Sequence, residues 1–179
     1  NERQRTDIEA FTQAIIDGYT DMELLMEFPS QSQRYFHNIE KIRQTVLSEH
    51  YSKNLRHNLK AIFISGNPGV GKTRYIYDRH NIEDIYRVSD YKNPFDNYKG
   101  QKILVLDEYA NQLNIQLLLN ILDIYPLLLP ARYNDKWACY EKVYVISNCD
   151  FDDLFGYYDE SIYRAIRRRF TLITERMNF

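Results

Sequence analysis

The spacing of apolar residues changes near residue 60, and this change divides the chain into two kinds of pattern. Before it, Ile8, Phe11 and Ile15 lie three to four residues apart, which is typical of one face of a helix. Residues 1–58 are therefore predicted to form a small all-α domain. This domain has more apolar surface than so few helices can bury alone. The surplus packs either on the rest of the chain or on neighbouring subunits, and both interpretations stay open.

Helix boundaries in this domain are predicted from capping patterns. Thr6 with Glu9, and Thr20 with Glu23, have the Thr-x-x-Glu spacing of a capping box, which marks a helix start. Pro29 is expected to end the helix that begins after Thr20. The apolar face predicted for that helix comprises Met22, Leu25 and Met26.

After residue 58, short apolar runs bounded by polar or glycine-rich segments replace the helical spacing, which is typical of buried strands. Helical stretches separate these runs. Strands that alternate with helices predict an α/β fold, a three-layer sandwich with a mostly parallel sheet, over residues 59–179. The predicted strands are Ala61–Ser65, Ile85–Val88, Lys102–Asp107 and Lys142–Ser147, and the helical stretches lie near Arg74–Arg79 and Asn114–Tyr125.

Composition excludes several classes of protein. The two cysteines, Cys139 and Cys149, have no paired Cys/His spacing, which argues against a disulfide framework or a zinc site and favours a reducing compartment. No apolar run reaches membrane-spanning length, so no membrane partner is expected. The net charge of -2 gives no overall basic field, so any nucleic-acid contact is expected to be local. The first residue is Asn1 rather than Met, and we expect a fragment of a longer protein.

The first predicted strand leads into a glycine-rich loop with the pattern G-x-x-x-x-G-K-[ST], the Walker A motif. Glycines let the backbone wrap around phosphates and turn its N–H groups inward. Lys72 is expected to contact the β- and γ-phosphates of ATP, and Thr73 to offer its hydroxyl to Mg²⁺. The segment therefore predicts a P-loop NTPase that uses ATP and Mg²⁺. The expected nucleotide-binding residues are Gly66, Asn67, Pro68, Gly69, Val70, Gly71, Lys72 and Thr73.

Two later strands end in residues suited to hydrolysis. Lys102–Asp107 is followed by Glu108, so Asp107 is predicted to hold the magnesium ion and Glu108 to act as general base on water. Asn148 follows the last predicted strand, where an amide could orient that water and sense the γ-phosphate. The paired Asp-Glu favours a hydrolase over a simple nucleotide binder.

These motifs within about ninety residues resemble superfamily 3 helicases, and finer matches resemble the rolling-circle replication initiators (Rep proteins) of circular single-stranded DNA viruses and related bacterial plasmids. Phe95–Gln101 is similar to that family's aromatic-Asp-x-Tyr-x-Gly segment. Tyr125–Leu127 and Leu129–Arg132 are similar to its B-prime region. The resemblance covers roughly residues 60–175, and the preceding helices resemble the family's oligomerisation region in position and character.

The resemblance implies a β-hairpin in the B-prime region that grips single-stranded DNA inside a ring. Arg132 and Lys136 suit phosphate contacts, and Tyr133 and Trp137 offer stacking faces. Lys136 is predicted to be the principal DNA contact and Arg132 the second. The alternative is an exposed hairpin whose charges are only solvated.

The family's arginine finger is placed by resemblance in Arg168-Arg169-Phe170, with Arg168 as the first candidate and Arg169 as the other. Arg167 precedes them, and the sequence does not separate the three. A finger stabilises charge on the γ-phosphate of the neighbouring subunit, so a homo-oligomeric, hexameric ring is expected. The alternative is a solvated or DNA-facing basic turn.

The predicted function is therefore an ATP-dependent DNA helicase or translocase domain of a replication initiator. The alternatives are a picornavirus-like superfamily 3 RNA helicase and a non-motor P-loop ATPase switch. A purely structural oligomerisation module is disfavoured by the intact Walker motifs. The initiators that this chain resembles usually carry a nicking domain that uses two histidines and a tyrosine nucleophile. No His-x-His pair is present here, so nicking is not expected of this chain. The expected location is the cytoplasm for a bacterial plasmid protein, or the host nucleus for a eukaryotic virus.

Overall fold

The computed structural model describes residues 1–176, and the chain forms two compact units, Asn1–Lys53 and Asn54–Phe179. The division falls after Lys53 rather than after Asn58. Each unit has its own core, and the two are described in turn. No helix within residues 1–176 has the length and apolar character needed to cross a membrane.

The first unit consists of four helices: α1 (Glu2–Ile16), α2 (Asp21–Glu27), α3 (Pro29–Arg34) and α4 (Phe36–Tyr51). They enclose a small core in which Leu24 is fully buried. The apolar face predicted for α2 is wrong, because Met22, Leu25 and Met26 are exposed. α2 ends at Glu27, with Phe28 as its C-cap directly before Pro29, as predicted, and Pro29 takes the first position of α3. The core residues are Phe11, Ala14, Ile15, Leu24 and Ile39.

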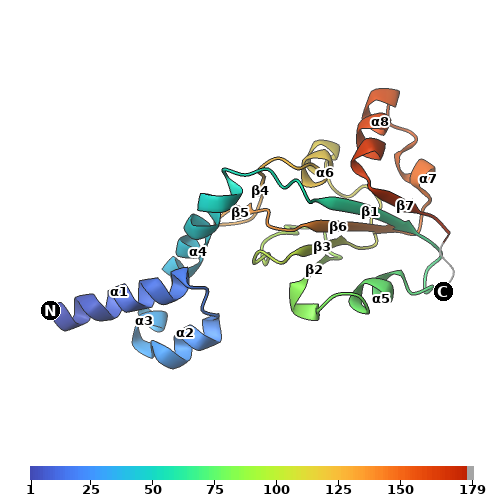
Figure 1. The fold of residues 1–179 in the computed structure, drawn as a ribbon. Helices are drawn as coiled ribbons and strands as arrows, with labels where there is room; N and C mark the ends of the chain where they lie inside the picture. Colours follow the sequence, from blue (N-terminus) through green and yellow to red (C-terminus); the bar gives the residue numbers. More distant parts are fainter. Residues whose placement is uncertain (177–179) are drawn as a thin grey trace. The chain divides into compact units, whose positions relative to one another are not determined.

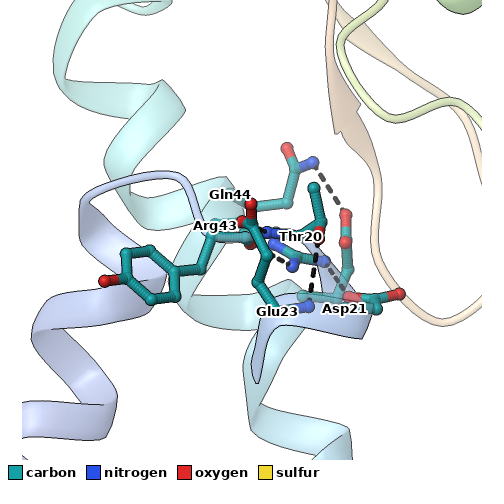
Figure 2. Close-up of polar contacts among 7 residues, drawn as sticks. Thr20, Asp21, Glu23, Arg43 and Gln44 are labelled. Atoms are coloured by element: carbon teal, nitrogen blue, oxygen red, sulfur yellow. Dashed lines mark hydrogen bonds and ion pairs between the residues drawn. The ribbon is translucent and has the colours of Figure 1, made fainter. Parts of the chain in front are cut away.

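Polar contacts fix the start of α2 against α4 (Figure 2). Thr20 and Glu23 form the predicted capping box, with each side chain bonded to the other residue's backbone N–H. Arg43 of α4 donates to Asp21 Oδ1 over 2.6 Å and to the Tyr19 carbonyl over 2.9 Å. The capping box predicted for Thr6 and Glu9 is wrong, since α1 begins at Glu2 and Thr6 lies within it.

The second unit is a five-stranded, all-parallel sheet in the order β2-β3-β6-β1-β7. The four predicted strands are confirmed, and the edge strand β7 was not predicted. The strands are β1 (Lys60–Ser65), β2 (Ile85–Val88), β3 (Ile103–Leu106), β6 (Lys142–Ser147) and β7 (Leu172–Thr174). β1 and β6 are in register from Lys60↔Lys142 to Ser65↔Ser147, so their carboxyl ends lie side by side.

Helices cover both faces of this sheet, which makes the predicted three-layer α/β sandwich (Figure 1). Leu104 and Val143 point to one face, with α6 (Ile115–Ile121), α7 (Phe151–Phe155) and α8 (Glu160–Arg169). The other face packs on α5 (Lys72–Tyr77), which buries Ile76 against Ile64, Val105 and Ile146. A 3₁₀ turn, η1 (Ile82–Asp84), leads into β2, and a short antiparallel hairpin joins β4 (Leu128–Leu129) to β5 (Lys136–Trp137).

Candidate nucleotide-binding and hydrolysis site

The glycine-rich loop connects β1 to α5 and is closed by its own lysine. Gly69 and Gly71 have φ angles of 81° and 93°, in the left-handed region that favours glycine. The buried Lys72 Nζ donates to the carbonyls of Gly66, over 2.7 Å, and Asn67, over 2.8 Å. Burial lowers the pKa of Lys72, and the charge of Asp107 opposes that shift. The loop thus holds a cation where phosphates are expected to bind.

Asp107 lies directly after β3 and is the centre of a polar cluster. Its Oδ2 accepts from the Thr73 hydroxyl over 2.8 Å and from Arg87 Nε over 2.7 Å. Its Oδ1 accepts from the Glu108 backbone N–H, and its carbonyl accepts from the Tyr91 hydroxyl. A hydroxyl and a carboxylate that meet beside a phosphate loop are hard oxygen ligands that suit Mg²⁺. The residues present therefore fit the predicted ion.

Arg87 is a site residue that the sequence analysis missed. Its guanidinium forms an ion pair with a carboxylate that is only 3% exposed, while Arg87 is 38% exposed. Asp107 raises the pKa of Arg87 through the hydrogen bond between them. The sequence did offer one signal, a charged residue inside the short predicted strand Ile85–Val88. Its pairing with Asp107 could not be predicted, because it depends on how β2 pairs with β3, where Arg87 lies opposite Val105.

Glu108 and Asn148 lie at the ends of neighbouring strands, as the sequence predicts. Glu108 has a positive φ of 49°, unusual for a residue with a side chain. Asn148 Oδ1 accepts from Lys72 Nζ over 3.1 Å, so the amide is held by the lysine that is expected to bind the phosphates. The Ser147 hydroxyl donates to the Tyr109 carbonyl over 2.7 Å, which joins the two strand ends.

These groups line one open cavity of about 310 Å³. It brings together the phosphate loop, the expected metal ligands, the expected base and the expected sensor. The lining residues are Pro68, Gly69, Gly71, Lys72, Thr73, Arg74, Asp107, Glu108, Ile146, Ser147 and Asn148. The hairpin and arginine candidates do not line this cavity.

The hairpin carries three of its four predicted DNA-binding side chains outward, and one inward. Tyr133 at the tip is 98% exposed, with φ 71°, and Trp137 is half-buried. Arg132 is exposed and pairs with Asp96 over 2.6 Å. Lys136 corrects the prediction, since it is only 7% exposed. It pairs with the buried Leu129, and paired residues of antiparallel strands share a face.

The three arginines at the end of α8 differ in their surroundings. Arg169 is 16% exposed and pairs with Asp123 over 2.9 Å, so its charge is neutralised by a carboxylate of the same chain. Arg167 lies over the Phe151 ring. Arg168 is exposed, and its side chain has no ion pair or hydrogen-bond partner among residues 1–176. The geometry favours Arg168 over Arg169 as a group that can reach another subunit.

The sequence of this chain is similar to a helicase family and to viral replication-associated proteins. The family model described as RNA helicase matches residues 62–151, half of the chain. A replication-associated protein of goose circovirus is 25% identical over 146 residues, covering 77% of this chain and 48% of the relative. That of human associated cyclovirus 1 is 24% identical over 176 residues, covering 92% and 60%. The chain thus spans between about half and three fifths of these relatives.

One solved structure, a primosome component from Streptococcus pyogenes serotype M3, is 15% identical with a TM-score of 0.41, covering 76% of this chain and 78% of that one. This likeness is too weak to add to the assignment. The family match is stronger, because its range holds every residue that lines the cavity. The chain therefore belongs to the RNA helicase family, and it is a superfamily 3 helicase domain of the kind found in viral replication-associated proteins.

Proposed function

We propose that this chain hydrolyses ATP and uses the energy to move along single-stranded DNA during the initiation of rolling-circle replication. One observation carries the proposal: Lys72, Thr73, Asp107, Glu108 and Asn148 line a single cavity at the carboxyl edge of a parallel sheet. This is the set of groups that phosphoryl transfer to water requires. The relatives' name, replication-associated protein, supports the role in replication.

Each cavity residue has a distinct role in this mechanism. Lys72 binds the β- and γ-phosphates, and Asn148, held by Lys72, orients the attacking water. Glu108 takes a proton from that water as the oxygen attacks the γ-phosphorus, and the bond to the β,γ-bridging oxygen breaks to give ADP and phosphate. Thr73 and Asp107 would hold Mg²⁺, which neutralises charge on the phosphates when bound.

Completion of the site by a neighbouring subunit supports a ring, which we propose to be hexameric. Arg168 is exposed and outside the cavity of its own chain, and a guanidinium from the next subunit would stabilise the γ-phosphate in the transition state. The hairpin would contact DNA through Tyr133, Trp137 and Arg132 by stacking and phosphate binding. Lys136 is not proposed to contact DNA, because its side chain is buried.

The compartment follows from the host in this proposal. A bacterial plasmid protein would act in the cytoplasm, and a protein of a eukaryotic virus in the host nucleus. Nicking and joining of DNA would belong to other parts of a longer protein, since the relatives are longer than this chain.

The test is steady-state ATP turnover per subunit, measured as protein concentration rises, with and without single-stranded DNA. The expected result is turnover that climbs with concentration and rises further with DNA, because each site needs its neighbour. Lys72→Ala is the matched inactive control. Turnover that is flat with concentration and indifferent to DNA would overturn the motor and favour a self-contained nucleotide switch.

A superfamily 3 RNA helicase is the second candidate, because the matching family model is described as RNA helicase. Competition between single-stranded DNA and RNA of the same sequence, with stimulation of turnover as the readout, separates the two. Stronger stimulation by RNA would support the second candidate. The Asp96-x-Tyr98-x-Gly100 spacing, similar to that of the DNA virus family, leads us to expect preference for DNA.

A further inference from the structure

The β4–β5 hairpin is too short to fix its own direction. It contains two residue pairs, Leu128↔Trp137 and Leu129↔Lys136, and an isolated two-stranded hairpin is marginally stable even when longer. Its tip residue Tyr133 is almost fully exposed, so the tip itself has little packing. Contacts from outside the hairpin must therefore set where the tip points.

Leu129 is buried in the main core, and polar contacts come from one short segment, Phe95–Tyr98, which reaches both sides of the hairpin. Asp96 Oδ1 accepts from the Arg132 backbone N–H over 2.8 Å, and Oδ2 accepts from Arg132 Nε over 2.6 Å. The Tyr98 hydroxyl accepts from the Cys139 backbone N–H over 3.1 Å. Arg132 follows β4 and Cys139 follows β5, so two residues of one segment hold the chain beyond each strand.

The segment is itself firmly anchored. Phe95 and Tyr98 are buried in the main core, and the Tyr98 ring packs on Tyr86 with 5.3 Å between ring centroids. The Tyr86 hydroxyl also donates to the Pro94 carbonyl. Tyr86 belongs to β2, whose next residue, Arg87, pairs with Asp107 in the nucleotide site. One strand thus contacts both the hairpin anchor and the metal-binding carboxylate.

Asp96 is charged where this arrangement needs it to be. The Arg132 backbone hydrogen bond, then the Arg132 side chain, lower the pKa of Asp96, and the charge of Lys136 adds to that effect. The clamp leaves the Arg132 side chain 62% exposed. The paired guanidinium is therefore held in a set direction at the surface rather than buried.

We propose that Asp96 is a positioning residue, which fixes the β4–β5 hairpin through Arg132, with Tyr98 as the second anchor. The clamp links the hairpin, through Tyr86 and Arg87 of β2, to the nucleotide site. That the positioned hairpin binds single-stranded DNA rests on the proposed function, whereas the clamp itself does not.

A simple electrostatic role makes the opposite prediction. A carboxylate beside basic residues repels phosphates, so its removal would tighten DNA binding. A clamp predicts that removal loosens the hairpin and weakens binding. Asp96→Ala and Asp96→Asn separate the two, because asparagine keeps an oxygen that can accept the Arg132 backbone N–H but carries no charge. Glu83→Gln is the control, since it removes one charge from an exposed position in η1.

The first measurement uses Trp137, the only tryptophan of the chain, as a reporter inside β5. Without DNA or nucleotide, Asp96→Ala is expected to shift Trp137 emission to longer wavelength and to increase collisional quenching, while Asp96→Asn shifts it less. Glu83→Gln is expected to match the wild type. Unchanged emission in Asp96→Ala would overturn the clamp, whatever the protein's function. Melting temperatures check that each variant is folded.

The second measurement is the affinity for single-stranded DNA over a range of salt concentrations. Asp96→Ala is expected to bind about tenfold more weakly, as for loss of one charge-assisted contact. The slope of log affinity against log salt is expected to fall by about one, because Arg132 loses its phosphate, and Asp96→Asn should recover most of both. Equal or tighter binding by Asp96→Ala would overturn the positioning role. If Asp96→Ala shows the fluorescence shift but the wild type binds no nucleic acid, the proposed function is overturned and the clamp stands.

Discussion

At the scale of single residues, the carboxylate of Asp107 is held from three directions. Thr73, Arg87 and the Glu108 N–H all donate to its carboxylate. Arg87 supplies the positive charge that a buried carboxylate needs when no metal is bound. Arg87 is therefore a built-in cation that would share Asp107 with the expected Mg²⁺.

This sharing predicts how Arg87→Ala behaves. Loss of the partner leaves Asp107 buried and unpaired, and we expect the nucleotide-free protein to be destabilised by about 1–2 kcal/mol, since Arg87 is partly exposed. Mg²⁺ with ADP restores positive charge, so the difference in melting temperature from the wild type should narrow when both are added.

The control is Arg164→Ala, which breaks an exposed ion pair with Glu160 on α8 and should change little in either condition. A melting difference for Arg87→Ala that persists unchanged with saturating Mg²⁺ and ADP would contradict the shared-carboxylate interpretation.

His80 gives a pH dependence of stability. Burial, then the charge of Lys142, lower its pKa below the ordinary 6.5, and its ring bonds to the Tyr144 hydroxyl. Asp84 raises and Arg79 lowers the same pKa. Because the unfolded chain binds this proton more readily, stability should fall as pH drops below about 6.5.

His80→Gln removes the titrating group, so the fall in melting temperature between neutral and mildly acid pH should be smaller than in the wild type. His37→Gln serves as the comparison, because His37 is an exposed residue of α4. An equal fall in the wild type and His80→Gln would show that other groups control acid stability.

At the scale of elements, the sequence predicted strands best where apolar runs have sharp polar boundaries. β2 and β6 begin and end at the predicted residues, Ile85–Val88 and Lys142–Ser147. β7 was missed because Leu172–Thr174 is short, incompletely buried and, within residues 1–176, paired with β1 alone, so no apolar pattern marks it. Its place depends on tertiary pairing that local spacing does not encode.

In the candidate site, too, the residues that depend on spacing along the chain were predictable, and those that depend on strand pairing were not. The phosphate loop, Asp107 and Glu108 were predictable, because their chemistry requires fixed distances along the chain. Arg87 and the inward side of Lys136 were not, because each follows from which strand lies opposite. Asp96 stood in the recognised aromatic-Asp-x-Tyr-x-Gly segment, yet its partner Arg132 lies 36 residues later.

The two adjacent arginines in the last turn of α8, Arg168 and Arg169, are predicted to have different roles. Arg168→Ala is expected to lower ATP turnover by about a thousandfold with little change in melting temperature, because an exposed finger acts only on the neighbour's transition state. Arg169→Ala should lower the melting temperature, because it breaks the pair with Asp123.

Turnover and thermal melting of both variants, measured side by side, check the assignment. A folded Arg168→Ala variant with wild-type turnover would contradict the finger, and Arg167 would then be the next candidate. Mixing inactive Arg168→Ala with inactive Lys72→Ala should recover some turnover, since each supplies what the other lacks.

At the scale of the whole molecule, the two units have separate cores. The core of the helical unit contains only residues up to Ile42, and both cores of the second unit begin at Leu59 or later. Arg56 ties the start of the second unit to its own body, since its N–H donates to the Ile124 carbonyl and its guanidinium to the Asp123 carbonyl. Nothing in the packing of either core requires the other.

This independence predicts the behaviour of fragment 54–179. It should fold, bind ATP analogues and keep the melting temperature of the second unit, because its cores and the Arg56 contacts are intact. The helical unit exposes Met22, Met26 and Phe36, and apolar surface of this kind favours association with other copies. If these helices assemble the subunits, the fragment should be monomeric in sedimentation experiments. It should also hydrolyse ATP slowly at every concentration, because no neighbour supplies Arg168. Turnover that still climbs with the concentration of the fragment would place the assembling surface on the second unit instead.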